Sequence, residues 1–231
     1  MLNYIWLNDK SPILNQLPNG FKSAAILLHP FTQMPSDWIE ENSKNAEKDE
    51  KVYPSDEEVL KLGKQVSWMS IMQECDLTNF SELAIALQTS ISALKEQYSR
   101  EDLAEKLNSN LRQDRFYPDE DDVSLFLIKD IKKVLESKGA KYFSYSNPIL
   151  DESGTLEIEK LMSLDNGKLS LKEVIISDEN MDFAFMSVFD SFITVFMARD
   201  GKIDDIVKKM GWEVIVCDDK TYIDWYWSNI Y

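Results

Sequence analysis

Hydrophobic residues recur at helical spacing through the middle of the chain, and toward its end they alternate with polar residues. The first stretch predicts a helix over residues 56–74, which Ser55 opens as a capping box with Glu58. Two further stripes of apolar residues predict helices over residues 80–98 and 103–111. The first half of the chain is therefore expected to be rich in helices.

Pro118 predicts the start of a fourth helix, because proline is favoured in a first helical turn. The four acidic residues Asp119–Asp122 would then occupy that turn, where the helix dipole favours negative charge, and Gly139 would end the helix. The acidic quartet lacks the spaced ligands, central glycine and distal glutamate of a calcium-binding loop. We therefore interpret it as a charged helix start.

From residue 140 the pattern changes to alternation, which predicts strands. A tight turn at Asp190–Ser191 joins two of them, a short helix over residues 203–210 ends at Gly211, and residues 156–164 fit helix and strand equally. Pro148–Gly154 is predicted as a turn. The predicted strands cover residues 141–146, 169–176, 183–189, 192–198, 213–217 and 222–227.

The first fifty residues carry weaker signals. An apolar run, Ala24–Leu28, is stopped by His29 and Pro30, because proline disfavours helix at the residue before it. Residues 40–54 are charged and nearly free of large apolar side chains, which is typical of a solvated loop or a partly disordered connection.

Helices followed by strands indicate an α+β fold. We expect one domain over residues 1–231, with a helix-rich part over about 55–139 and then a mainly antiparallel sheet with a short helix over about 140–231. A chain of this length can bury a substantial core.

The net charge of the chain limits the classes of binding partner that we expect. The chain has 41 acidic and 25 basic residues, giving a net charge of −16. The excess is even, with 24 acidic against 16 basic residues up to position 140 and 17 against 9 after it. Without a basic stripe, binding to nucleic acid or to an anionic membrane is not expected. The simpler explanation of this negative charge is solubility, and the more specific one is an acidic recognition surface.

The two cysteines, Cys75 and Cys217, have neither disulfide nor metal-ligand spacing and lack flanking cations that would activate a thiol. We expect reduced, buried thiols and a cytoplasmic protein, because residues 1–10 do not form a secretory signal. The apolar stretch over residues 181–198 contains charged residues and is interpreted as buried strands, not as a membrane span.

The C-terminal segment concentrates carboxylates and aromatic rings. In a strand over residues 222–227, one face would carry two tyrosines around an aspartate, and Ile223, Trp225 and Trp227 would face the core. This surface could bind a cationic side chain of a basic protein partner by charge pairing and cation–π contact, whereas the simpler interpretation is a closing strand whose aromatic residues only pack. The predicted binding residues are Asp218, Asp219, Tyr222, Asp224 and Tyr226.

A divalent-cation site is the alternative for these carboxylates. Asp190, Asp218 and Asp219 could supply its oxygen ligands, although no metal-binding motif accompanies them and Asp218–Asp219 is also ordinary turn sequence. We expect no cofactor, because no glycine-rich phosphate motif is present. His29, the single histidine, is interpreted as a structural imidazole and not as a catalytic base.

Four short segments support a resemblance to known proteins. At His29–Phe31, Val66–Met72, Phe189–Phe192 and Asp224–Trp227 the chain resembles a family of uncharacterised proteins from bacilli, which implies no activity. Its acidic, aromatic C-terminal half is more loosely similar to bacterial immunity proteins that neutralise nuclease toxins.

The leading hypothesis is a non-enzymatic, immunity- or inhibitor-like domain that binds a basic protein through an acidic aromatic surface. The alternative is a divalent-cation-dependent hydrolase or phosphotransfer enzyme that uses clustered aspartates. A third possibility is a structural domain whose charge serves only solubility.

Overall fold

The computed structural model describes residues 1–43, 52–162 and 171–227, without the side chains of Ser43 and Met162. The chain forms two compact units. Unit 1 contains Met1–His29 and the described chain from Asp119 onward, and unit 2 contains Pro30–Pro118. Unit 2 is thus inserted in sequence between two parts of unit 1.

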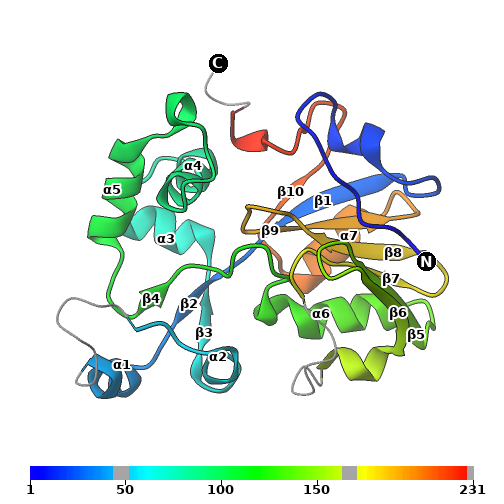
Figure 1. Ribbon diagram of the computed structural model, residues 1–231, viewed down its shortest axis with the longest axis horizontal. Helices are drawn as coiled ribbons and strands as arrows, with labels where there is room; N and C mark the ends of the chain where they lie inside the picture. Colours follow the sequence, from blue (N-terminus) through cyan, green and yellow to red (C-terminus); the bar gives the residue numbers. More distant parts are fainter. Residues whose placement is uncertain (44–51, 163–170, 228–231) are drawn as a thin grey trace. The chain divides into compact units, whose positions relative to one another are not determined.

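Unit 1 is built on a seven-stranded sheet with the order β10-β1-β9-β8-β7-β5-β6, in which every neighbouring pair is antiparallel (Figure 1). The strands are β1 (Ser23–Leu28), β5 (Tyr142–Asn147), β6 (Glu152–Glu157), β7 (Ile175–Asp178), β8 (Phe183–Ser187), β9 (Ile193–Ala198) and β10 (Val214–Val216). Together with seven α-helices in the described chain, this sheet confirms the α+β class.

The early apolar run forms β1, which lies between β10 and β9. Ala25 is paired with Phe196 on one side and with Val216 on the other. Residues Ala24–Leu28 are all buried, as expected for a central strand covered on both faces. The first segment of the chain is therefore part of the C-terminal sheet.

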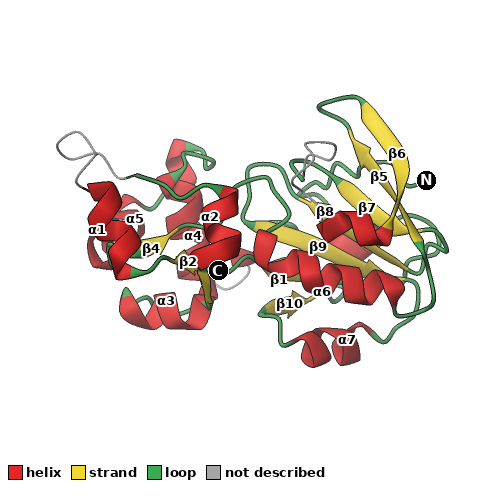
Figure 2. Cartoon of the chain, turned by 90° about the horizontal axis from the view of Figure 1, so that it is seen from below, coloured by secondary structure: helices red, strands yellow, loops and turns green. Residues whose placement is uncertain are grey.

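Both faces of this sheet are covered. Helix α6 (Leu125–Glu136) lies over one face (Figures 1 and 2). The short 3₁₀ segments η1 (Ile13–Gln16) and η5 (Trp225–Trp227) lie on the other side (Figure 1), where the Ile13 amide donates to the Thr221 carbonyl at 2.8 Å. The N-terminal and C-terminal segments of unit 1 therefore run side by side.

Unit 2 combines helices with a small antiparallel sheet of order β3-β2-β4. Its strands are β2 (Phe31–Gln33), β3 (Lys64–Val66) and β4 (Arg115–Phe116). Its helices are α1 (Ser36–Ser43), α2 (Asp56–Leu62), α3 (Trp68–Glu74), α4 (Phe80–Ser90), the 3₁₀ turn η2 (Glu96–Tyr98) and α5 (Glu101–Asn110).

The predicted single helix over residues 56–74 is wrong. The Ser55–Glu58 capping box is present and starts α2, but the chain becomes extended at Gly63 and forms β3 before Ser67 caps α3. Apolar residues on both sides of Gly63 continue the helical spacing, so periodicity alone does not show this interruption.

Two other helix boundaries differ from the prediction. The stripe over residues 80–98 contains α4 only to Ser90, after which Ser92 adopts a positive φ of 60° that ends the helix. The acidic quartet is not a helix start, because α6 begins at Leu125 and Asp119–Asp122 belongs to the preceding loop. By contrast, α5 confirms the third predicted helix, and α7 (Ile203–Met210) ends at Gly211 with a left-handed φ of 71° as expected.

Strand boundaries are shifted in several places. The last three residues of the predicted turn over 148–154 belong to strand β6 (Glu152–Glu157), and the undecided segment 156–164 contains the end of β6 followed by the 3₁₀ helix η3 (Ile158–Met162). Strand β7 starts only at Ile175, later than predicted. Residues 163–164 and 169–170 of these two segments lie outside the described residues, as does 44–51 of the predicted loop over 40–54.

The predicted terminal strand over residues 222–227 is absent. The chain forms the 3₁₀ turn η5 there, in which the Trp227 amide donates to the Asp224 carbonyl at 2.9 Å. Without strand geometry the side chains do not alternate: Trp225 is buried, and Ile223 and Trp227 are half-buried. In the described part of the chain, no helix is both long and apolar enough to span a membrane.

Candidate functional site

The C-terminal carboxylates fall into two environments. Asp218 and Asp219 are exposed and follow β10. The Asp218 carboxylate accepts hydrogen bonds from the Thr221 hydroxyl at 2.8 Å and the Lys220 amide at 2.9 Å, and these bonds lower the pKa of Asp218. This carboxylate therefore stabilises the turn.

The remaining predicted binding residues are half-buried. The Tyr226 ring lies against Trp225 and Trp227, with centroids 5.8 and 5.6 Å away, and burial raises the pKa of Tyr226 to about 12. Burial is also the main reason that the pKa of Asp224 is raised. Tyr222 is half-buried as well, so the fully exposed acidic residues of this segment are Asp218 and Asp219.

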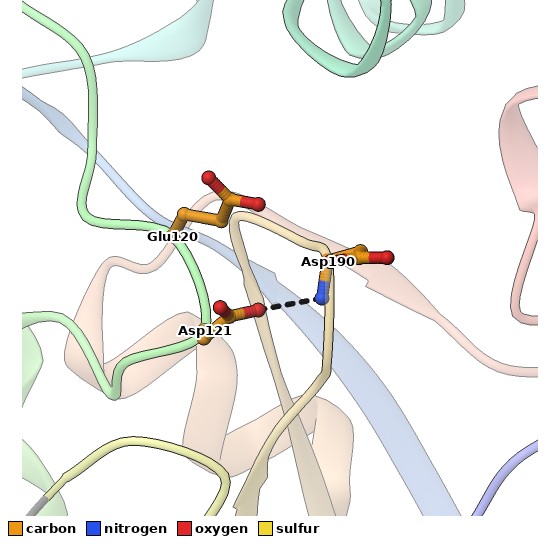
Figure 3. A group of neighbouring side chains, drawn as sticks. All are labelled: Glu120, Asp121 and Asp190. Atoms are coloured by element: carbon orange, nitrogen blue, oxygen red, sulfur yellow. Dashed lines mark hydrogen bonds between the residues drawn. The ribbon is translucent and has the colours of Figure 1, made fainter. Parts of the chain in front are cut away.

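The structure brings Asp190 together with acidic residues that the sequence analysis assigned to a helix start. Glu120, Asp121 and Asp190 each offer a carboxylate oxygen within 4.8 Å of the others (Figure 3). Across the described chain, Asp218 and Asp219 do not belong to such a group.

Three segments meet to build this acidic group. The Asp121 amide donates to the Ser191 carbonyl at 3.0 Å, and the Asp190 amide donates to the Asp121 carboxylate at 2.5 Å (Figure 3). The Glu173 amide donates to the Asp121 carbonyl at 3.1 Å. Asp121 and Asp190 both have positive φ, 67° and 50°, which aspartate tolerates better than most residues. The loop before α6 is thus fixed against the β8–β9 turn.

The carboxylates repel one another. Burial, together with the charges of Asp121 and Asp190, raises the pKa of Glu120, and burial and Asp121 raise the pKa of Asp190. Glu173 is 8% exposed, and its pKa is raised by burial, then by Asp121 and by Asp190, whereas Lys172 acts in the opposite direction. Within residues 1–43, 52–162 and 171–227 no ion pair neutralises these four carboxylates.

The turn that carries Asp190 also carries an exposed aromatic ring. Trp6 is 58% exposed and Phe189, next to Asp190 in sequence, is 48% exposed, and their rings meet edge-on with centroids 6.5 Å apart. The Tyr4 ring centroid lies 5.0 Å from that of Trp6, and the Tyr4 hydroxyl donates to the Ser187 carbonyl at 2.8 Å. We call Trp6, Glu120, Asp121, Phe189 and Asp190 together the Asp190 surface.

The sequence does not show this surface as a unit. Its signals were visible separately, as the acidic quartet and the Asp190–Ser191 turn. No spacing rule connects residues 6, 120 and 190, because a ring contact places Trp6 at Phe189 and hydrogen bonds hold the loop of Asp121 at Asp190.

Other candidate residues have structural roles. His29 is fully buried, its Nε2 lies 2.9 Å from the Thr194 hydroxyl, and burial lowers its pKa to about 3. The cysteines are free and buried, and burial raises the pKa of Cys75 to about 11 and that of Cys217 to about 12. Neither thiol has the lowered pKa of a nucleophile. Both cysteines are free and buried, as the sequence predicted.

Comparison with known proteins assigns the chain to a family. The family of proteins of unknown function DUF2711 matches residues 9–227. The chain belongs to this family. It is 46% identical over 226 residues to the uncharacterized protein YwbB of Bacillus subtilis (strain 168), a match that covers 98% of this chain and all of YwbB. The resemblance to uncharacterised proteins from bacilli is thus confirmed for this DUF2711 protein. No solved structure matches the chain.

Proposed function

We propose that this DUF2711 protein is a non-enzymatic binding protein of the immunity or inhibitor type, whose Asp190 surface receives a basic segment of a protein partner. The observation that carries the proposal is the exposed Trp6–Phe189 ring pair, whose Phe189 directly precedes Asp190 of the acidic group formed with Glu120 and Asp121. Flat aromatic rings and unneutralised carboxylates are the two components that recognise an arginine or lysine side chain.

Each component supports a different part of recognition. The exposed rings offer apolar area of the kind that dominates binding energy at protein interfaces. The carboxylates supply charge complementarity, which accelerates encounter with a basic partner and opposes acidic ones. At low ionic strength the net charge of −16 also attracts basic partners, and repels acidic ones, over longer distances.

The C-terminal residues Asp218, Asp219, Tyr222, Asp224 and Tyr226 form a second proposed contact region. The exposed pair Asp218–Asp219 is the part most open to a partner. The two regions can be distinguished by substitution, because they share no residue.

The test is affinity capture from a Bacillus subtilis lysate with the whole chain immobilised, followed by affinity measurement with the purified captured protein. The wild type is compared with Trp6→Ala/Asp190→Asn and with Asp218→Asn/Asp219→Asn, a double variant in the second proposed contact region. We expect a basic protein that is retained at low salt and released at high salt. The Trp6→Ala/Asp190→Asn variant should bind it at least about tenfold more weakly, a loss of about 1.4 kcal/mol.

A greater loss in the Asp218→Asn/Asp219→Asn variant would move the binding site to the C-terminal region. The binding function itself would be contradicted if no basic protein were retained preferentially at low salt. Circular dichroism of all three proteins shows whether each variant keeps the wild-type fold.

A further inference from the structure

One edge of the seven-stranded sheet is open to another strand. Strand β10 ends the strand order beside β1, and within the described chain no other strand pairs with its outer side (Figure 1). Its residues, Val214–Val216, are all apolar, and Val216 is 40% exposed. Soluble proteins protect such edges with charged residues, proline or bulges, because an open edge pairs with other chains. Strand β10 has no charged residue or proline, and its register with β1 is uninterrupted.

The opposite edge, strand β6, is protected by charge. It begins with Glu152 and ends with Glu157, so an antiparallel pair of β6 strands from two copies would bring like charges together. Of the two edges, β10 is therefore the one suited to pairing with a second copy.

The backbone of β10 leaves hydrogen-bonding groups unused on its outer side. The Cys217 amide donates to the Ala24 carbonyl at 2.9 Å, and the Leu28 amide donates to the Glu213 carbonyl at 3.0 Å. Alternate residues of an antiparallel strand face opposite neighbours, so positions 213, 215 and 217 face β1. The N–H and C=O groups of the positions between them therefore point outward.

These outward groups belong to Val214 and Val216. The next outward amides on either side are already bonded: the Trp212 amide donates back to α7, and the Asp218 amide donates to the Thr221 hydroxyl at 3.0 Å. The edge thus offers two donors and two acceptors, which are symmetric about the residue between the valines.

The charges at the two ends of β10 are complementary between copies. Exposed Lys208–Lys209 end α7 just before the strand, and exposed Asp218–Asp219 follow it. Each end also contains one residue of the other sign, Glu213 or Lys220, so the ends keep opposite net charges. An antiparallel pair sets the basic end of one copy beside the acidic end of the other.

We propose that β10 is the interface of a symmetric dimer, in which the β10 strands of two copies pair antiparallel about a two-fold axis at Ile215. Val214 of each copy then pairs with Val216 of the other, and the two pairs exchange four N–H···O=C bonds. The facing side chains are all β-branched, as in stable cross-strand pairs. This inference uses no residue of the Asp190 surface and does not depend on the proposed partner binding.

Such a dimer is weak, because three residues a side make a small interface. The net charge of −16 on each copy opposes association, but at about 0.15 M salt the Debye length is about 8 Å and repulsion beyond it is largely screened. We expect a dissociation constant of about 10⁻⁵ to 10⁻⁴ M.

Sedimentation velocity of the whole chain, from about 10 μM to about 1 mM at constant ionic strength, measures this equilibrium. Val216→Lys should weaken dimerisation at least about tenfold, because a lysine on an edge blocks strand pairing. The matched control is Thr155→Lys, which adds the same charge at an exposed position of the β6 edge. It should change the dissociation constant by less than about twofold.

Amide hydrogen exchange of the wild type, followed by NMR, tests the register without any variant. Raising the concentration from about 10 μM to about 1 mM should slow exchange of the Val214 and Val216 amides at least about threefold. The Ile215 amide, which faces Ile26 of β1 in monomer and dimer alike, should not change.

Charge reversal tests the antiparallel arrangement. Lys209→Glu and Asp219→Lys should each weaken the dimer at least about threefold, because each creates repulsion at both ends of the interface. Combined in one chain they restore opposite signs and the wild-type net charge, so the double variant should recover the wild-type dissociation constant.

The proposal is overturned if the wild type stays monomeric up to about 1 mM, about tenfold above the weakest expected dissociation constant. Equal effects of Val216→Lys and Thr155→Lys, unchanged exchange at Val214 and Val216, or a double charge variant as weak as the single ones would also overturn it, since the copies would then meet through another surface. None of these outcomes affects the proposed partner binding, because no other protein is present.

Discussion

At the residue scale, the single histidine shows how burial fixes a protonation state. His29 is fully enclosed beside Thr194, and its ring is held neutral because burial lowers its pKa to about 3 from 6.5. The unfolded chain can bind a proton there below pH 6.5, whereas the folded chain cannot until about pH 3. Its contribution to stability is therefore complete above pH 6.5 and is lost as the pH falls.

From this difference we expect that lowering the pH from 7 to 5 reduces the free energy of unfolding by about 2 kcal/mol through His29. His29→Gln, which does not titrate, should lack this part of the pH dependence. Urea denaturation of both proteins at the two pH values measures it, and all other titrating groups cancel in the comparison. Equal losses in the wild type and the variant would show that His29 can be protonated in the folded state.

At the element scale, Gly63 decides where one apparent helix becomes two helices and a strand. A Cβ atom at this position would lie 2.6 Å from the Val59 carbonyl oxygen, which is backbone and cannot move aside easily. Glycine therefore lets the chain make its extended turn from α2 into β3 without this clash.

We expect Gly63→Ala to destabilise the protein by about 1–3 kcal/mol, the range for forcing extra atoms into a packed site. Gly201→Ala is the matched control, because a Cβ atom there meets nothing within 4 Å and its φ is not left-handed. Urea denaturation measures both variants. If Gly63→Ala were as stable as Gly201→Ala, the helix break would have another cause.

At the scale of the whole molecule, the two units are linked because the sequence of unit 2 interrupts the sequence of unit 1. Unit 1 needs β1 from the start of the chain as a central strand, and unit 2 occupies the sequence between β1 and the rest of that sheet. The chain passes from β1 to β2 across only His29 and Pro30. With so little chain between them, we propose that both units unfold as one domain.

This proposal predicts that the most protected amides of both units exchange through the same global opening. Hydrogen exchange measured by mass spectrometry, at increasing low concentrations of urea, should give one free energy of opening for peptides from β8–β9 and from α4. Ala25→Ser, a polar substitution in the buried centre of β1, should lower that value equally in both units. Two separate values, with only unit 1 responding to the substitution, would indicate two domains.

Local signals predicted the parts of the fold that neighbouring residues control. The capping box at Ser55, the apolar stripe of α5 and the left-handed Gly211 after α7 were all predicted correctly, because each depends on residues within about one helical turn. The period-two pattern likewise predicted most of β8 and β9.

The sequence by itself thus determined the α+β class, the strong acidity and a few helix ends, because spacing, capping and charge are properties of adjacent residues. Only the tertiary structure decided that β1 joins the distant sheet, that residues 225–227 form a 3₁₀ turn, and that Glu120, Asp121 and Asp190 form one group. Those outcomes depend on strand pairing and hydrogen bonds between segments far apart in the chain, and no periodicity within a segment encodes its distant partner.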